Sequence, residues 1–250
     1  MHFTSETSSD GVVERRFVLD GVPGVLWQPD GSGLGGRPLV LLGHGGGGDR
    51  WGSRERARRC VARYGWAAVA IDAPGHGERP RTAQDERFAT EIGELLAAGR
   101  PLSAWVARHT AALAERAVPE WRAVLDALAG AEGAEGTAGE GLGPVGYWGL
   151  SLATAIGIPL TAVELRIRAA VFGLAGHASL LEAAGRVTVP VEFVLQWDDE
   201  LQPREGVLAL YGALGSREKT LYANPGGHRA VPGFEAAASE GFLLRHLGRG

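Results

Sequence analysis

The stretch Gly149-Leu150-Ser151-Leu152-Ala153 decides the fold of this chain. It follows the apolar run at residues 144–148, which is typical of a buried strand, and a helical pattern begins at Leu152. A serine between two such elements predicts a nucleophile elbow, a sharp turn that exposes the hydroxyl at the carboxyl edge of a sheet. The turn brings the backbones two residues before and after the serine together, so both positions need small side chains. Ala153 meets that need, although the usual pattern ends in glycine.

Acidic and histidine side chains follow two predicted strands downstream of the serine. Residues 190–195 form an apolar run that ends shortly before the acidic pair Asp198 and Asp199. The short strand predicted at residues 218–223 runs into a glycine-containing loop that carries His228. The order serine, acid, histidine, each just past a strand, matches the triad order of α/β-hydrolases. Successive side chains that leave a strand point in different directions, so only one of the two acids can face the histidine.

Two loops upstream of the serine complete the pattern. The apolar run at residues 38–42 ends in Gly43-His44-Gly45-Gly46-Gly47-Gly48, and the next predicted strand, at residues 66–71, ends in Asp72-Ala73-Pro74-Gly75-His76-Gly77. Glycine backbone can approach a substrate closely, so the first loop can offer N–H groups to an oxyanion. It lacks the Gly-Lys-Ser/Thr ending of a phosphate loop, which argues against a nucleotide site.

With these five motifs in register, the chain resembles the α/β-hydrolase superfamily, most closely its dienelactone-hydrolase-like and small serine-esterase branch. The resemblance covers roughly residues 17–247. Dienelactone hydrolases use a cysteine nucleophile, whereas this elbow carries Ser151. That difference favours ordinary ester hydrolysis over lactone hydrolysis.

The resemblance also assigns roles to individual residues. Ser151 is expected to attack a carbonyl carbon, with His228 as its base. In related hydrolases the orienting acid commonly stands four residues before a proline, and counting back from Pro203 selects Asp199 over Asp198. The N–H of Leu152 lies at the start of a helix, where the helix dipole favours negative charge. By analogy with the family, Gly46 supplies the second oxyanion donor, with neighbouring Gly45 as the alternative.

The order of elements predicts an α/β fold: a mostly parallel central sheet with helices on both faces, in one domain over residues 1–250. The expected strands are at residues 12–20, 22–28, 38–42, 66–71, 144–148, 168–173, 190–195 and 218–223. The expected helices are at residues 53–64, 152–164, 178–185, 204–214 and 234–247, with a helical segment at 83–130. Residues 130–143 are interpreted as an exposed loop of low complexity.

A small helical insertion is expected after the fourth of these strands, at residues 78–119. It holds more helix than one crossover requires and is broken at Gly99-Arg100-Pro101. Two interpretations stay open. One is an ordinary sheet-covering helix with an extra surface helix, and the other is a small cap over the active site that shapes acyl or alcohol specificity.

Composition bounds the remaining properties. With 25 basic and 29 acidic residues, the net charge of −4 argues against a general nucleic-acid binder. No apolar run reaches the roughly 18 residues of a membrane span, and the polar first ten residues lack a signal-peptide core, which favours a cytoplasmic location. The single Cys60 cannot form an internal disulfide and is expected to be a packed apolar residue.

The seven histidines of the chain do not form a metal-binding motif, because no pair has ligand spacing. We therefore expect no metal and no cofactor. His44 and His76 are interpreted as hydrogen-bonding residues that position their loops, and His177 can line the pocket. The other three, His2, His109 and His246, are expected on the surface.

Together these features predict a serine esterase that cleaves a small or medium carboxylic ester through an acyl-enzyme intermediate. The expected partner is a small-molecule ester, with neither nucleic acid nor membrane, and the protein is expected to be a monomer or homodimer. A thioesterase or a lactonase would use the same triad. The fold also hosts non-hydrolytic lyases and accessory binding proteins, which stay open as alternatives.

Overall fold

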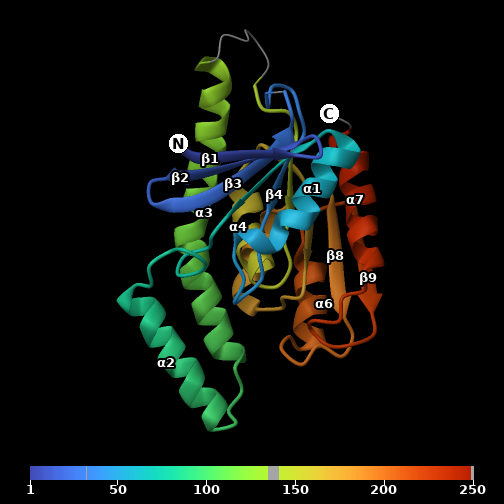
Figure 1. Ribbon diagram of the computed structural model, residues 1–250. Coiled ribbons are helices and arrows are strands. Elements are labelled where there is room, and N and C mark those ends of the chain that lie inside the picture. Colours follow the sequence, from blue (N-terminus) through green and yellow to red (C-terminus); the bar gives the residue numbers. More distant parts are fainter. Residues whose placement is uncertain (32, 135–140, 249–250) are drawn as a thin grey trace.

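In the computed structural model, which describes residues 1–31, 33–134 and 141–248, nine strands form one sheet in the order β1-β2-β3-β5-β4-β6-β7-β8-β9 (Figure 1). The pairs β1–β2, β2–β3 and β3–β5 are antiparallel, and all other pairs of neighbouring strands in the sheet are parallel. The strands are β1 (His2–Ser9), β2 (Val12–Leu19), β3 (Val22–Pro29), β4 (Leu39–Leu42), β5 (Ala67–Ile71), β6 (Val145–Trp148), β7 (Ile167–Gly173), β8 (Val191–Gln196) and β9 (Lys219–Asn224).

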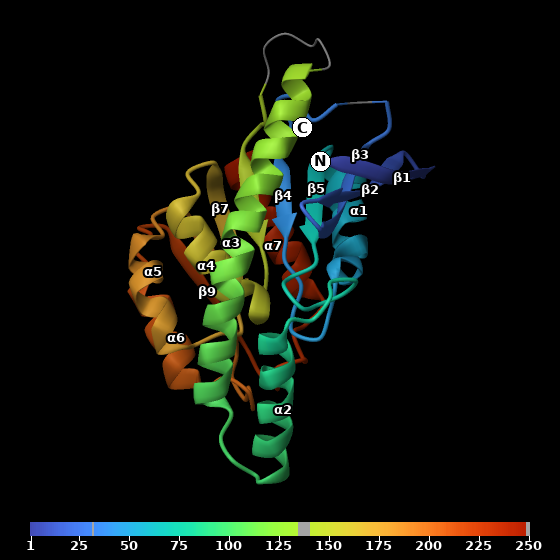
Figure 2. The same ribbon diagram turned by 90° about the vertical axis from the view of Figure 1, so that its left-hand side faces the viewer.

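Helices cover both faces of this sheet (Figure 2). On one face, α1 and α7 bury apolar residues such as Val61 and Phe242 against the sheet. The other face is covered by α4, α5, α6 and the second half of α3, which bury residues such as Leu125 and Ile158. The helices are η1 (Arg50–Ser53), α1 (Arg54–Tyr64), α2 (Ala83–Ala97), α3 (Ser103–Ala134), α4 (Leu152–Val163), η2 (Ala178–Leu180), α5 (Leu181–Arg186), α6 (Arg204–Ala213) and α7 (Phe234–Leu247). The predicted fold class is confirmed.

Two segments differ from the sequence-based prediction. Strand β1 was not predicted, because its polar side chains are almost all exposed and it pairs only with β2. Counted along the chain, the insertion therefore follows the fifth strand, β5, rather than the fourth. The interpretation of residues 130–143 as a loop is wrong at its start, where α3 continues to Ala134, and residues 135–140 lie outside the described part of the chain.

The insertion is a helical hairpin formed by α2 and the first half of α3. Helix α2 starts at a capping box in which Thr82 and Asp85 exchange side-chain and backbone hydrogen bonds, and it ends before Gly99 with a φ of 61°. Asp85 is the only buried residue in α2, and Leu96 is 61% exposed. Helix α2 therefore does not cover the sheet but projects from the molecule beside the start of α3 (Figure 1).

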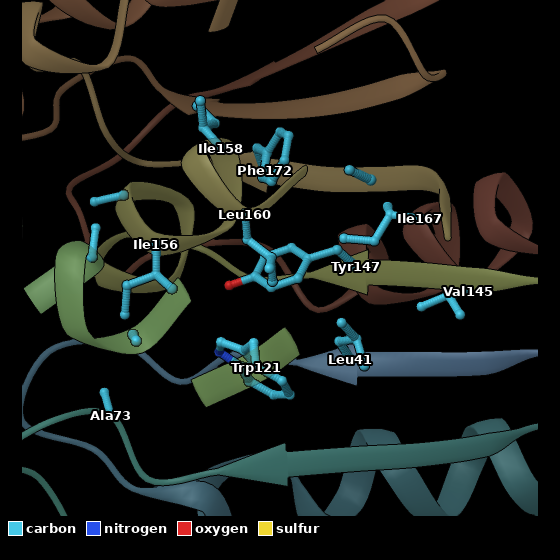
Figure 3. Packing of buried hydrophobic residues seen from close by; sticks show 14 of the residues in the cluster. Leu41, Ala73, Trp121, Val145, Tyr147, Ile156, Ile158, Leu160, Ile167 and Phe172 are labelled. Atoms are coloured by element: carbon cyan, nitrogen blue, oxygen red, sulfur yellow. The ribbon is translucent and has the colours of Figure 1, made fainter. Parts of the chain in front are cut away.

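Tyr147 of β6 anchors the core beneath the elbow. Its ring lies between Trp121 of α3 and Phe172 of β7 (Figure 3), at centroid distances of 6.4 and 5.8 Å. Its hydroxyl donates a hydrogen bond of 2.6 Å to the carbonyl of Ala153, in the first turn of α4. A Cβ on Gly157 would lie 2.1 Å from this ring, so α4 approaches β6 closely only because that position is glycine. Tyr147 thus fixes the start of α4 relative to the sheet.

Candidate active site

Ser151 occupies a strained turn between β6 and α4. Its φ of 61° and ψ of −117° lie where non-glycine residues are rare, and its N–H donates to the carbonyl of Gly173 at the end of β7. A Cβ on Gly149 would lie only 2.4 Å from the Cβ of Ala153, and one on Gly43 would lie 2.5 Å from it. Alanine is tolerated at position 153 because the two residues packed against its Cβ, Gly43 and Gly149, are glycines. This is the close approach expected of a nucleophile elbow.

The structure brings the three predicted triad residues together. Nε2 of His228 lies 2.9 Å from Oγ of Ser151, and Nδ1 of His228 lies 2.8 Å from Oδ2 of Asp199. The Asp199 side chain is 1% exposed and that of His228 is 10% exposed, so water is largely excluded from this contact. The hydrogen bonds place a base beside the serine hydroxyl and a carboxylate behind the base, which is the arrangement that activates a serine.

Three successive acids hold the loop that carries His228. Asp198 accepts a 3.0 Å hydrogen bond from the N–H of Gly226, and Glu200 accepts one of 2.9 Å from the N–H of His228. The hydrogen bond from His228 also lowers the pKa of Glu200 below its ordinary value. Only Asp199 reaches the imidazole. Asp198 is thus a loop-stabilising residue, whereas the position of Glu200 was not anticipated from the sequence.

The two predicted oxyanion donors come from different segments of the chain that line one cavity with Ser151. Leu152 is the first residue of α4, where N–H groups have no partner within the helix. Gly46 lies in a turn closed by a hydrogen bond from Gly48 N–H to the Gly45 carbonyl, and both Gly46 and Leu152 line the same cavity as Ser151. Gly45 is not among the residues that line it. The positions favour Gly46 over Gly45 as the residue that faces a substrate.

A cavity of about 710 Å³ opens above Ser151. Its walls are mostly apolar and come largely from the helical hairpin of α2 and α3. From that side they include Ile92, Leu96, Pro101, Leu102, Trp105 and Val106. The rest of the lining includes His177 and the loop at residues 199–203. Both parts of the chain therefore bound the space in which a substrate would lie.

The remaining histidines differ in their surroundings. His44 is buried, its Nδ1 lies 2.9 Å from the Gly45 carbonyl, and its Nε2 accepts a hydrogen bond from the N–H of Ala73. Burial lowers its pKa. His44 therefore joins the two predicted loops. His76 bonds the carbonyl of Pro74 through Nδ1 and also lines the cavity, as does His177.

The interpretation of His109 as a surface residue is wrong. Its ring stacks on Trp105 at 4.7 Å, and the residue lines the cavity. The signal was present in the sequence, because Trp105 and His109 are four residues apart and so share one face of α3. His246, expected on the surface, is half-buried beside Phe242, while His2 is exposed in β1.

Cys60 is fully buried in α1, and burial raises the pKa of its thiol to about 12. A thiol in that state is a packing residue, as expected. Among the side chains that the structure describes, those of residues 1–31, 33–130 and 141–248, no cluster of three or more acidic, histidine or cysteine residues could hold a metal ion. Among the helices in those same ranges, none has the length and apolar character needed to cross a membrane.

One relative of known structure decides the family. A cold-adapted esterase from an Arctic intertidal metagenomic library, in its PEG-bound complex, is 36% identical to this chain, with a TM-score of 0.76. The match covers 99% of this chain and 100% of that one. The chain belongs to the α/β-hydrolase superfamily. Its placement in the dienelactone-hydrolase-like branch stays a prediction.

More distant structures share the fold of this α/β-hydrolase. An acetyl xylan esterase from Paenibacillus sp. R4 is 16% identical over 98% of this chain and 88% of that chain, with a TM-score of 0.65. An esterase from Pyrococcus furiosus is 14% identical over 98% of this chain and 91% of that chain, with a TM-score of 0.62. No protein-family model and no curated protein matches the chain.

Proposed function

We propose that this α/β-hydrolase is a serine esterase that cleaves a small or medium carboxylic ester through an acyl-enzyme intermediate. The observation that carries the proposal is the chain of hydrogen bonds from Asp199 through His228 to Ser151, at the base of a cavity large enough for such a substrate. Its relatives of known structure that are named esterases support the same chemistry.

The proposed reaction uses the triad twice. Oγ of Ser151 bonds to the carbonyl carbon while its proton passes to Nε2 of His228. The imidazolium then gives this proton to the leaving alcohol oxygen as the ester C–O bond breaks, and the acyl group stays on Ser151. Water next loses a proton to His228 and attacks the acyl carbon. The imidazolium returns this proton to Oγ of Ser151 as the bond from Oγ to the acyl carbon breaks, which releases the carboxylic acid and restores the serine. Asp199 holds the imidazole in the required tautomer throughout.

Negative charge develops twice on the carbonyl oxygen in this scheme. We assign its stabilisation to the N–H groups of Leu152 and Gly46, two residues that line the cavity from α4 and from the glycine loop. Donors fixed by a helix start and a closed turn need no reorganisation during the reaction. One such donor typically stabilises the transition state by about 3 kcal/mol.

We further propose that the hairpin at residues 78–119 acts as a cap that selects the substrate. The apolar residues that α2 and α3 contribute to the cavity support this role. When no substrate is bound, much of that apolar surface is in contact with water. Leu96, for example, is 61% exposed. An apolar acyl or alcohol chain lying against it would gain the free energy of burial.

Labelling with a fluorophosphonate probe tests the proposal, because only an activated serine reacts quickly with it. Peptide mass spectrometry should locate the label on Ser151 and not on Ser103, which lines the same cavity without a histidine hydrogen bond. The His228→Ala variant should label far more slowly. Label on another residue, or unchanged labelling of His228→Ala, would contradict the proposed triad.

A further inference from the structure

Two polar side chains lie unpartnered in the wall of the cavity. His177 is 8% exposed, and within the described residues its imidazole has no hydrogen-bond partner. Gln202 is 5% exposed and uses its Oε1 to accept a hydrogen bond from the N–H of Gly176, which leaves its amide N–H groups without an acceptor in the same part of the chain. None of these unpaired atoms is fully sealed from solvent, so each is free to bond to a molecule that enters the cavity.

The two residues lie on loops that are hydrogen-bonded to each other. The hydrogen bond from the N–H of Gly176 holds the Gln202 side chain beside Gly176, which directly precedes His177. A Cβ on Gly206 would lie 2.5 Å from the Gly176 carbonyl, so this loop packs against the start of α6 at backbone distance. The N–H of Gln202 is in turn bonded to Oδ1 of Asp199 at 2.9 Å. Gln202 is therefore held in place by the same carboxylate that orients His228.

The chemistry of the pair suits an uncharged group that both donates and accepts hydrogen bonds. Burial lowers the pKa of His177, so its imidazole is neutral at pH 7 and offers one N–H donor and one nitrogen acceptor. The Gln202 amide adds N–H donors. A hydroxyl group can donate to the imidazole nitrogen and accept from the amide, whereas a methyl group of the same size can do neither.

We propose that His177 and Gln202 form a polar subsite that binds an uncharged hydroxyl group of the ester substrate near its scissile bond. This subsite rests on the proposed esterase function. The hydroxyl can belong to the acyl or to the alcohol part, since both lie in the cavity with Ser151. In a mostly apolar cavity, such a subsite makes the enzyme prefer a hydroxylated ester over its alkyl analogue.

The test compares esters that differ only by exchange of a hydroxyl for a methyl group. Ethyl 3-hydroxybutyrate against ethyl 3-methylbutyrate examines the acyl side, and 2-hydroxypropyl butyrate against 2-methylpropyl butyrate examines the alcohol side. The parent enzyme should favour the hydroxylated ester in kcat/KM by about tenfold in one of the two pairs, as expected for one or two hydrogen bonds. The pair that shows the preference identifies the side of the substrate that is recognised.

Two variants then locate the preference. His177→Phe keeps a ring but removes both hydrogen-bonding atoms, and Gln202→Glu keeps the acceptor for Gly176 while replacing the amide donor. Each should bring the ratio of the two kcat/KM values toward one. His2→Phe makes the same exchange in exposed β1 and should leave the ratio unchanged.

Equal kcat/KM within twofold in both substrate pairs for the parent would overturn the subsite, as would a preference that survives in both variants. If one variant does not fold, the kcat/KM ratios of the parent and of the other variant still test the subsite. Ser151-dependent hydrolysis of all four esters without preference overturns the subsite alone. Hydrolysis that persists in Ser151→Ala, or none of the four esters cleaved by the parent, overturns the proposed esterase function as well.

Discussion

At the scale of single residues, Asp199 has two tasks. Its Oδ2 contacts Nδ1 of His228 at 2.8 Å, while its Oδ1 accepts hydrogen bonds from the N–H groups of Leu201 and Gln202 at 2.8 and 2.9 Å. One carboxylate therefore both orients the imidazole and shapes the loop that borders the cavity. Asp198, next to it, contacts only the backbone of the histidine loop among the described residues.

Replacing each acid with its amide separates these tasks. In Asp199→Asn the amide oxygen can still accept from the loop, so we expect a folded protein. Its kcat should fall by up to about 10⁴-fold, because an amide cannot hold the reactive tautomer or offset the charge of the imidazolium. Asp198→Asn keeps an acceptor for Gly226 and should lose far less. Steady-state kinetics with circular dichroism checks this, and a reversed ranking would move the triad acid to Asp198.

The elbow makes a second prediction at this scale. In Gly149→Ala the new Cβ would meet the Cβ of Ala153 at 2.4 Å, so the free energy of unfolding should fall by about 1–3 kcal/mol. Gly241→Ala, at an exposed position of α7, is the matched control, because nothing lies within 4 Å of the new Cβ there. That variant should be as stable as the parent or gain up to about 1 kcal/mol. Denaturant unfolding that shows equal effects would rule out the close approach.

At the scale of elements, the cap proposal predicts a change in chain-length preference. Val106→Phe narrows the cavity from α3, so kcat/KM for a decanoate ester relative to an acetate ester should fall by about tenfold or more. Val163→Phe makes the same exchange at the exposed end of α4, where Val163 is 46% exposed, and should leave that ratio unchanged. An unaltered profile in Val106→Phe, across acyl and alcohol series alike, would favour the alternative of a plain packing role.

The packing of β8 against α7 makes stability depend on pH through Glu192. This residue is 1% exposed, and burial raises its pKa to about 7, aided by nearby Glu235 and opposed by the Ser239 hydrogen bond and by Arg245. The unfolded chain releases this proton near pH 4.5, before the folded protein does. The contribution of Glu192 to stability therefore falls between these two values and stays low above pH 7.

Glu192→Gln removes the loss of stability that comes from ionising this buried carboxyl group. The variant should exceed the parent in free energy of unfolding by on the order of 2 kcal/mol above pH 7, and the difference should vanish toward pH 4.5. Glu115→Gln, on the exposed surface of α3, controls for the change in net charge. Urea unfolding at several pH values measures the effect. A constant difference across the pH range would show that Glu192 does not titrate in this way.

At the scale of the whole molecule, most elements could be predicted because the core strands are continuous apolar runs between amphipathic helices. The exceptions lie where a segment has little to bury. Polar β1 is stabilised by backbone pairing with β2, a non-local interaction that its own residues do not reveal. The start of α3 and all of α2 were predicted as helix, but their position over the cavity depends on tertiary packing.

The site was predictable to a similar extent. Ser151, Asp199 and His228 each follow a strand of a parallel sheet, and the carboxyl ends of such strands meet at one edge. Their convergence therefore follows from the topology. The contacts of Glu200 and Gln202 were missed, because each depends on how two loops pack and no local motif marks them. His109 was missed although its spacing from Trp105 places both side chains on one face of α3.

The most direct test of the central claim is the kcat/KM of Ser151→Ala, His228→Ala and the double variant on one ester. Because the two residues act as a unit, each single variant should lose on the order of 10⁴-fold or more, and the double variant should lose little further. A metal chelator should leave the parent unaffected. Activity of Ser151→Ala within tenfold of the parent, or losses that multiply in the double variant, would contradict an esterase mechanism built on this triad.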